Sequence, residues 1–473
     1  MKRYSLLTAA AISFLLIYFF SPLYAQSPEE RKRELLERIE SLRLTEAPPR
    51  LYHRLFAFDW GGWLTETFTD PQNDVNASPK YAFREDIRLW LKGGVRIPKD
   101  LPKFLGKEHF IYFRAKNATQ HEHKGNSDND GPHVDMLYLS SDFGRLKTRI
   151  GRRFNSLGRG ITYADIHDGA DLEADLNFIS LKAFYSKTLP HEHNIDASAP
   201  GFNKHYNRHF FGTEVQYLKM SKHIPYFYYM RTIDRSDETP ISNSADFDYD
   251  SYYLGAGSRG EFFIPNLRYF NEWIWERGKS RLSNSIDAAR VKSWAVDTGL
   301  EYYFLFVTHP VAKIQFARGS GDADRISVTN TTNGNTAGRD KNFLYFGHFT
   351  NGGYALNVRL SNINVYRIGM TLKPLEPISP SRVKNTLWAG LREMTLGTDY
   401  YIFRKSKPGG GISDRRGSRV LKEVGMEWDV FLTWRVTSDL NWSFQWANFK
   451  PGDAFYPDRE HERFLSSSLT WAF

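Results

Sequence analysis

Near its end the chain alternates strictly between apolar and polar residues. Met426, Trp428 and Val430 alternate with Glu427 and Asp429, and two further runs of this kind follow before the chain stops. Successive side chains of a β-strand point to opposite faces, so each run has one apolar and one polar face. Such strands suit a sheet with hydrocarbon on one side and water on the other. An antiparallel sandwich with a buried apolar face is the alternative.

The clearest alternation lies between residues 84 and 97. One parity is apolar and consists of Ile87, Leu89, Leu91, Val95 and Ile97. The other parity is charged and consists of Arg84, Asp86, Arg88, Lys92 and Arg96. A soluble sheet would turn these charges to solvent, whereas a barrel would turn them into its lumen.

Strands of the same type are predicted along most of the chain. Besides the runs above, they lie at residues 56–64, 109–116, 134–141, 145–153, 172–186, 208–219, 225–234, 249–262, 266–277, 291–305, 311–318, 354–360, 362–373, 383–395 and 397–404. These runs predict an all-β fold: a single transmembrane antiparallel β-barrel of about 16 to 18 strands, and most simply about 18. Long polar connections alternate with short turns, as in bacterial outer-membrane barrels. Neither a linker nor a repeat divides the chain into sandwich domains.

The first 25 residues have the pattern of a secretory signal peptide. A basic start precedes an apolar run from Leu6 to Phe20, and the small residue Ala25 marks the predicted cleavage site. The remaining sequence has no apolar stretch long enough for a transmembrane helix. The chain has no cysteine, so the exported protein cannot be a small scaffold held together by disulfides.

Residues 26–50 are predicted to form a periplasmic helical segment with a proline-rich joint. Ser27 can cap a helix that extends to Leu44, and Pro48 and Pro49 end the segment. Residues 28–44 would cap the pore or bind a periplasmic partner, and a fraying linker is the alternative. Residues 51–473 then form the outer-membrane barrel.

Charge and aromatic content narrow the function. The net charge of +9 favours anionic partners, such as acidic sugars or the phosphates of lipopolysaccharide. Aromatic residues make up 15% of the chain, which suits girdles at the two membrane interfaces. Nucleic acid is not an expected partner of an exported chain without a recognition motif.

Several segments, in order, resemble the alginate-export family of outer-membrane porins. They are Arg149 to Phe154 with Asp168 to Leu172, Ala317 to Asp322, Phe343 to Tyr366, Gly425 to Asp429, and Phe449 to Phe455. Within them, Arg153 stands where the family usually has Gln. The resemblance implies an outer-membrane channel for a charged solute or polysaccharide. It also implies that the terminal aromatic Phe473 is recognised by the barrel assembly machinery. The parity of the last strand predicts that the Phe473 ring faces lipid and that Thr470 and Ala472 point inward.

The predicted pore-lining residues combine strand parity with this resemblance. They are Arg84, Asp86, Arg88, Lys92, Arg96, Arg149, Arg152, Arg153, Asp168, Glu427 and Asp429. Parity places Arg149 and Arg153 on the inward face, whereas the resemblance alone places Arg152 and Asp168 in or near the pore. Basic side chains with interspersed acids would select anions without trapping them. Structural ion pairs that brace the barrel wall are the alternative for any one of these residues.

These patterns predict a porin or exporter rather than an enzyme, located in the outer membrane and in contact with lipid and lipopolysaccharide. No catalytic residue, metal ligand or cofactor is predicted. The alternatives are a barrel-embedded enzyme that modifies lipid or glycan, and a secreted sugar-binding β protein. The triplets His121–His123 and His191–His193 are interpreted as loop residues rather than as a metal site.

Overall fold

The computed structural model describes residues 51–52, 56–72, 81–98, 102, 106–122, 127–189, 207–220, 222–235, 247–282, 289–323, 338–377, 391–457 and 459–473. Every element that it gives bounds is a strand. Among these residues no helix is both long and apolar enough to cross a membrane. The predicted signal peptide at 1–25 and helical segment at 26–50 lie outside the described residues.

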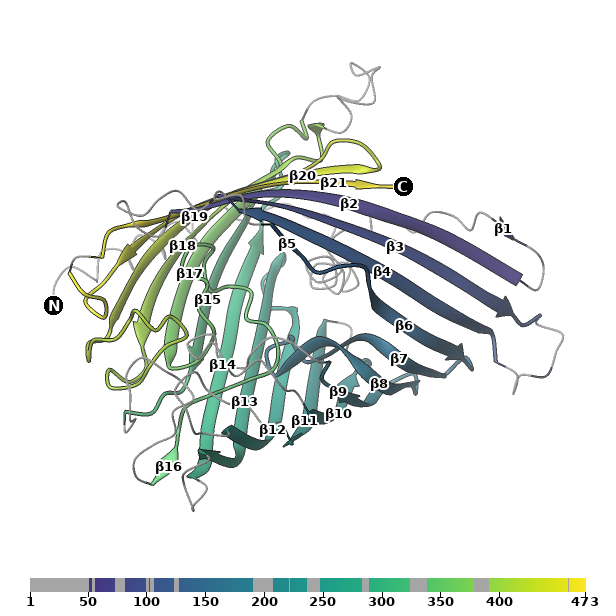
Figure 1. The fold of residues 1–473 in the computed structure, drawn as a ribbon, viewed down its shortest axis with the longest axis horizontal. Coiled ribbons are helices and arrows are strands. Elements are labelled where there is room, and N and C mark those ends of the chain that lie inside the picture. Colours follow the sequence, from purple (N-terminus) through teal and green to yellow (C-terminus); the bar gives the residue numbers. More distant parts are fainter. Residues whose placement is uncertain are drawn as a thin grey trace.

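Within the described part of the chain, 18 strands form one antiparallel wall (Figure 1). They are β2 (Phe56–Gln72), β3 (Ala82–Arg96), β4 (Glu108–Glu122), β6 (His133–Asp142), β7 (Leu146–Leu157), β8 (Tyr163–Asp175), β9 (Ile179–Lys187), β10 (Arg208–Tyr217), β11 (His223–Asp234), β12 (Phe247–Glu261), β13 (Leu267–Leu282), β14 (Ala289–Tyr303), β15 (Val311–Gly319), β17 (Ile363–Leu372), β18 (Thr395–Lys405), β19 (Glu423–Arg435), β20 (Leu440–Pro451) and β21 (Glu462–Ala472). The short strands β1 (Leu51–Tyr52), β5 (Ser127–Asn129) and β16 (Arg339–Asp340) pair at its margins.

The first and last strands of the wall close it into a barrel. β2 pairs with β21 over the register from Trp63–Ala472 to Gln72–Arg463, and it pairs with β3 on its other side. Beyond the last strand residue, the backbone of Phe473 exchanges two hydrogen bonds of 3.0 Å with that of Gly62. A Cβ atom at Gly62 would lie 2.8 Å from the Phe473 ring, so the missing side chain lets the terminal ring pack there.

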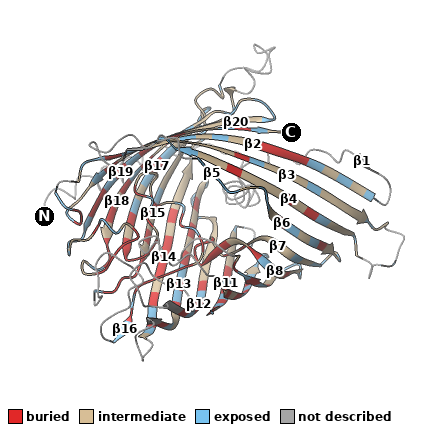
Figure 2. Cartoon of the chain, viewed as in Figure 1, coloured by how far each residue is buried: buried red, intermediate tan, exposed pale blue. Residues whose placement is uncertain are grey.

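Strand parity gives the barrel an apolar outside and a polar inside. On β3, Leu89 and Leu91 are exposed while Asp86 is buried. On β19, Trp428 is exposed while Glu427 and Asp429 are buried. This inverts the usual distribution of a soluble sheet and matches strands that face lipid outside. Buried residues are frequent on β11 to β14 and on β18, whereas β3 and β6 carry few (Figure 2).

The two ends of the barrel differ in the length of their connections. β2 begins at one rim of the barrel, and β21 ends with Phe473 at the same rim. Most connections at this rim are short, such as 143–145, 176–178 and 436–439. The opposite rim carries the connections 188–207, 235–246, 320–362 and 406–422. In outer-membrane barrels short turns face the periplasm and long loops face outward, so the second rim is the external one.

The predicted strand number agrees with the barrel, but two predicted strands are wrong. Residues 354–360 form no strand and belong instead to a connection folded into the lumen. The predicted strand at 172–186 is divided by a turn at 176–178 into the end of β8 and most of β9. The first half of β8 was not predicted, and most of the predicted strand at 383–395 lies outside the described residues.

Replacing Phe473 with Ser should reduce the amount of assembled barrel in the outer membrane several-fold. The predicted register of the last strand is confirmed, because Trp471 and Phe473 are exposed on the outer face while Thr470 is buried. Heat-shift electrophoresis of outer-membrane fractions measures the folded barrel. Phe263→Ser, in an exposed turn at the same rim, is the matched control. Equal losses in the two variants would contradict a special role of the terminal ring.

Candidate functional site

One part of the lumen wall is built from ion pairs between β3, β4 and β6. The carboxylate of Asp86 accepts a hydrogen bond of 2.8 Å from Arg88 Nε and lies 3.8 Å from Lys116 Nζ. Asp135 lies 2.6 Å from Arg114 and 3.7 Å from Arg88. Each acid therefore holds two cations, which fixes the basic side chains in place along the wall.

The wall continues on β7 and β8. Asp171, which is buried, pairs with both Arg149 and Arg153, and Arg149 also pairs with Glu173. On β9, Lys182 donates a hydrogen bond of 2.9 Å to the carbonyl of Ser156. We call the inward cations Arg84, Arg88, Lys92, Arg96, Arg114, Lys116, Arg149 and Arg153 the basic wall.

The basic residues of β3 recur along almost the whole strand. Arg84, Arg88, Lys92 and Arg96 stand four residues apart on one parity, so consecutive side chains are about 14 Å apart and the row extends about 40 Å. Lys92 Nζ lies 4.3 Å from the centre of the Phe110 ring. At the periplasmic end, Arg96 is 3.9 Å from Glu108 and remains half exposed.

Arg152 and Asp168 lie on the outer face of the barrel and not in the lumen. In the register of β6 and β7, Arg152 stands opposite Leu137, an exposed residue of the lipid-facing parity. Its guanidinium donates two hydrogen bonds to Asp168, of 2.9 and 3.1 Å. The prediction that these two residues line the pore is therefore corrected. Strand parity alone predicts the outer face for Arg152, because Arg152 is next in sequence to Arg153, which points inward.

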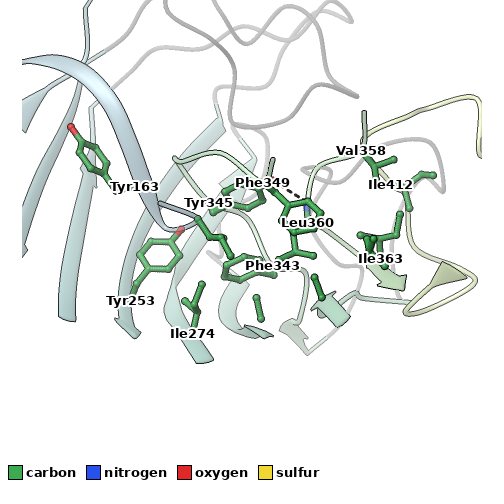
Figure 3. Close-up of a cluster of buried hydrophobic side chains, with 14 of the residues drawn as sticks. Tyr163, Tyr253, Ile274, Phe343, Tyr345, Phe349, Val358, Leu360, Ile363 and Ile412 are labelled. Carbon is green, nitrogen blue, oxygen red and sulfur yellow. Dashed lines mark hydrogen bonds between the residues drawn. The ribbon is translucent and has the colours of Figure 1, made fainter. Parts of the chain in front are cut away.

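The connection between β15 and β17 fills part of the lumen. Residues 341–362, which we call the inner loop, bury Phe343, Tyr345 and Leu360 almost completely. Figure 3 shows these side chains against the wall residues Tyr253 and Ile274. Burying such side chains contributes about 1.5–3 kcal/mol each, so the loop has its own apolar core inside the barrel.

Two buried glutamates on β13 hold one side of this core. Glu276 accepts hydrogen bonds from the Leu344 amide at 3.3 Å and from the Tyr253 hydroxyl at 3.0 Å. Glu272 accepts from the Arg159 amide and from two tyrosine hydroxyls of β11. Each carboxylate is satisfied by several donors, which is the condition for burying such a group.

Of the two predicted lumen acids Glu427 and Asp429, Glu427 holds the other side of the inner loop. Glu427 accepts hydrogen bonds from the amides of Ala355 (2.6 Å) and Leu356 (3.0 Å). Gly353 has a positive φ of 80°, and a Cβ there would lie 2.5 Å from the Glu427 carboxylate. Both acids face inward and are buried, so Glu427 is an anchor of the loop rather than an open contact for a solute.

A bidentate ion pair ties the loop to β17 and β18. Arg367 donates to both carboxylate oxygens of Asp399, at 2.9 and 2.7 Å, and to the side chain of Asn351 at 2.8 Å. Fork-to-fork pairs of this type combine charge with fixed geometry. The inner loop is thus held from β12, β13, β17 and β19.

The connection between β18 and β19 is fixed at the external rim by a cluster of charges. Asp414 pairs with Arg416 at 2.8 Å and with Arg459 at 3.2 Å. Burial raises the pKa of the Asp414 carboxyl, but the hydrogen bond and charge of Arg416, with the charge of Arg459, outweigh it and hold the pKa below its usual range. Asp414 therefore stays ionised, and both arginines also pair with Glu462.

The sequence prediction missed the anchors of the inner loop and part of the basic wall. Glu272 and Glu276 alternate with the exposed Trp273 and Trp275, so parity was a usable signal for two inward acids. The same holds for Lys116, the last residue of the predicted strand at 109–116. No grouping of His, Asp and Glu that could hold a metal occurs among the described residues, and His123 and the 191–193 triplet lie outside them.

A closed barrel with a lipid-facing apolar surface, a charged lumen and a loop folded into that lumen defines an outer-membrane channel of the porin type. The fold is similar to solved structures of Pseudomonas aeruginosa OccK5 (OpdH), with TM-score 0.56, 11% identity and coverage of 88% of this chain and 98% of that one. Acinetobacter baumannii OccAB4 has a TM-score of 0.54 and 9% identity, with coverage of 90% of this chain and 100% of that one. The Pseudomonas aeruginosa outer membrane protein OpdK has a TM-score of 0.52 and 11% identity, with coverage of 88% of this chain and 99% of that one. At these identities the likeness shows the shared fold alone.

The family profile described as alginate export matches residues 114–464, and the chain belongs to this family. No curated protein sequence matches the chain significantly. Family and fold together make the chain an outer-membrane porin, a channel and not an enzyme.

Proposed function

We propose that the channel passes an anionic solute, of the class of acidic polysaccharides such as alginate, by diffusion along the basic wall. The row of Arg84, Arg88, Lys92 and Arg96 along β3 is the observation that carries the proposal. Its approximate length of 40 Å, from the rise of a strand, is close to the thickness of a bilayer with its headgroups. A passing carboxylate would therefore meet a cation at each stage of the passage.

The acids of the wall support transfer rather than tight binding. Asp86 and Asp171 hold their arginines at fixed positions and neutralise part of their charge. A carboxylated solute would exchange contacts with partly neutralised cations and leave each of them readily. A neutral sugar would lack this attraction, so selectivity for anions follows from the same arrangement.

Purified protein in planar bilayers tests this function. Under a KCl gradient, the reversal potential should have the sign of an anion-selective channel, and selectivity should weaken as salt screens the wall. Oligouronates added to one side should interrupt the current, whereas neutral oligosaccharides of equal length should not. Cation selectivity, or equal block by both sugars, would contradict the proposal.

A further inference from the structure

A second group of basic residues lies on the outer face of the barrel, near the external rim. Arg231 on β11 stands in register with Tyr252, Tyr252 with Arg277, and Arg277 with Lys292. One row nearer the rim, Lys279 is opposite Arg290. We call Arg231, Arg277, Lys279, Arg290 and Lys292 the outer basic patch. Their neighbours along the strands, including Met230, Glu276 and Val291, are buried, so the patch faces outward.

An aromatic band borders the patch on the side of the membrane. Tyr229, Tyr252, Trp273 and Trp275 are all exposed on the same face. Tyrosine and tryptophan gather at the level of the lipid headgroups, so the cations beside them lie at the membrane–water interface. At that depth an outward-facing Arg or Lys costs about 0–1 kcal/mol, against about 2–4 kcal/mol at the midplane.

The patch has little compensation from the protein. Among the described residues, Arg231, Lys279, Arg290 and Lys292 form no ion pair, while Arg277 donates to the backbone carbonyl of Glu276 at 2.8 Å. Asp250 stands in register with Lys279, but its carboxylate accepts from the Asp234 amide at 2.9 Å.

Elsewhere on the outer face the balance is different. Arg152 is paired with Asp168 by two hydrogen bonds, and Arg404 lies 3.4 Å from Glu423. In the outer basic patch, by contrast, Arg277 faces Lys292 and Lys279 faces Arg290 across neighbouring strands about 5 Å apart. Like charges directly opposite each other destabilise a sheet unless an anion lies between them.

We propose that the outer basic patch binds the phosphate groups of lipopolysaccharide. The external rim faces the outer leaflet, and lipid A places its phosphates at the headgroup level where the patch lies. Two cross-strand cation pairs, about 7 Å apart along the strands, can hold one phosphate through several charge-assisted hydrogen bonds. The acyl chains would then cover the aromatic band below.

Binding of fluorescent lipid A to the full-length barrel in detergent tests this proposal. The wild-type protein should bind lipid A with its phosphates, and should bind dephosphorylated lipid A and phosphatidylglycerol much more weakly. The double variant K279Q/R290Q should lose about tenfold or more in affinity, since each basic residue near an anionic lipid surface contributes about a factor of five.

The matched control is K450Q/R463Q, which removes two exposed cations from the outer face of β20 and β21. It should keep near wild-type affinity. Both variants should retain the heat-shift and conductance of the wild-type barrel, which separates lost binding from lost folding. Equal affinity of K279Q/R290Q and wild type, equal loss in the control, or equal binding of phosphorylated and dephosphorylated lipid A would overturn the proposal.

Discussion

The Glu427→Ala channel should conduct at least about twofold more current than wild type, because ion flow grows with the open cross-section. The substitution removes the acceptor of the Ala355 and Leu356 amides. A buried amide without an acceptor costs about 1–3 kcal/mol, so the inward position of the loop loses about 2–6 kcal/mol. Single-channel recording should show larger and noisier openings.

Two variants make this experiment specific. Glu427→Gln keeps one acceptor oxygen and should give an intermediate increase. Glu423→Ala removes an exposed carboxylate at the start of the same strand, whose side chain pairs with Arg404, and should leave conductance unchanged. If Glu427→Ala and Glu423→Ala conduct equally, Glu427 does not hold the loop in the conducting path.

The double variant R149Q/R153Q should change the channel from anion-selective to cation-selective. Both arginines pair with Asp171, and Arg149 also pairs with Glu173, so their loss leaves acids without counter-charges. A unit charge about 4 Å from a passing ion is worth about 1 kcal/mol in water. Two lost charges should lower the anion-to-cation permeability ratio by roughly tenfold or more.

The reversal potential under a KCl gradient measures this ratio directly. R152Q/K187Q is the control, because it removes two cations from the outer face of the same part of the barrel. Its selectivity should equal that of the wild type. A selectivity change of the same size in this control would show that global charge, rather than the basic wall, sets the preference for anions.

Strand parity predicted the two faces of the barrel because it depends only on neighbouring residues. Leu89 and Asp86 lie where the alternation puts them, as do Trp428 and Glu427. Arg152 shows the limit of combining evidence. Resemblance to the family placed it in the pore, but its parity with the exposed Ile150 places it outside.

The inner loop was beyond such local reasoning. The alternation of its apolar residues, such as Leu356 and Val358, predicts a strand at 354–360. They are buried in the lumen instead, and the partners that make this possible are distant in sequence. Glu427 is separated by 72 residues from Ala355, and Glu276 by 68 residues from Leu344. Alternation within a single strand contains no information about such contacts.

The inner loop places the path of the solute off the central axis of the barrel. Because the buried core lies against the wall from β8 to β20, a solute is displaced toward β3 and β4, where Arg88 and Arg114 are. The width available to cargo then depends on one connection of the chain and not on the circumference of the barrel. Relatives with the same number of strands can therefore differ in the size of solute they admit while presenting an unchanged surface to the membrane.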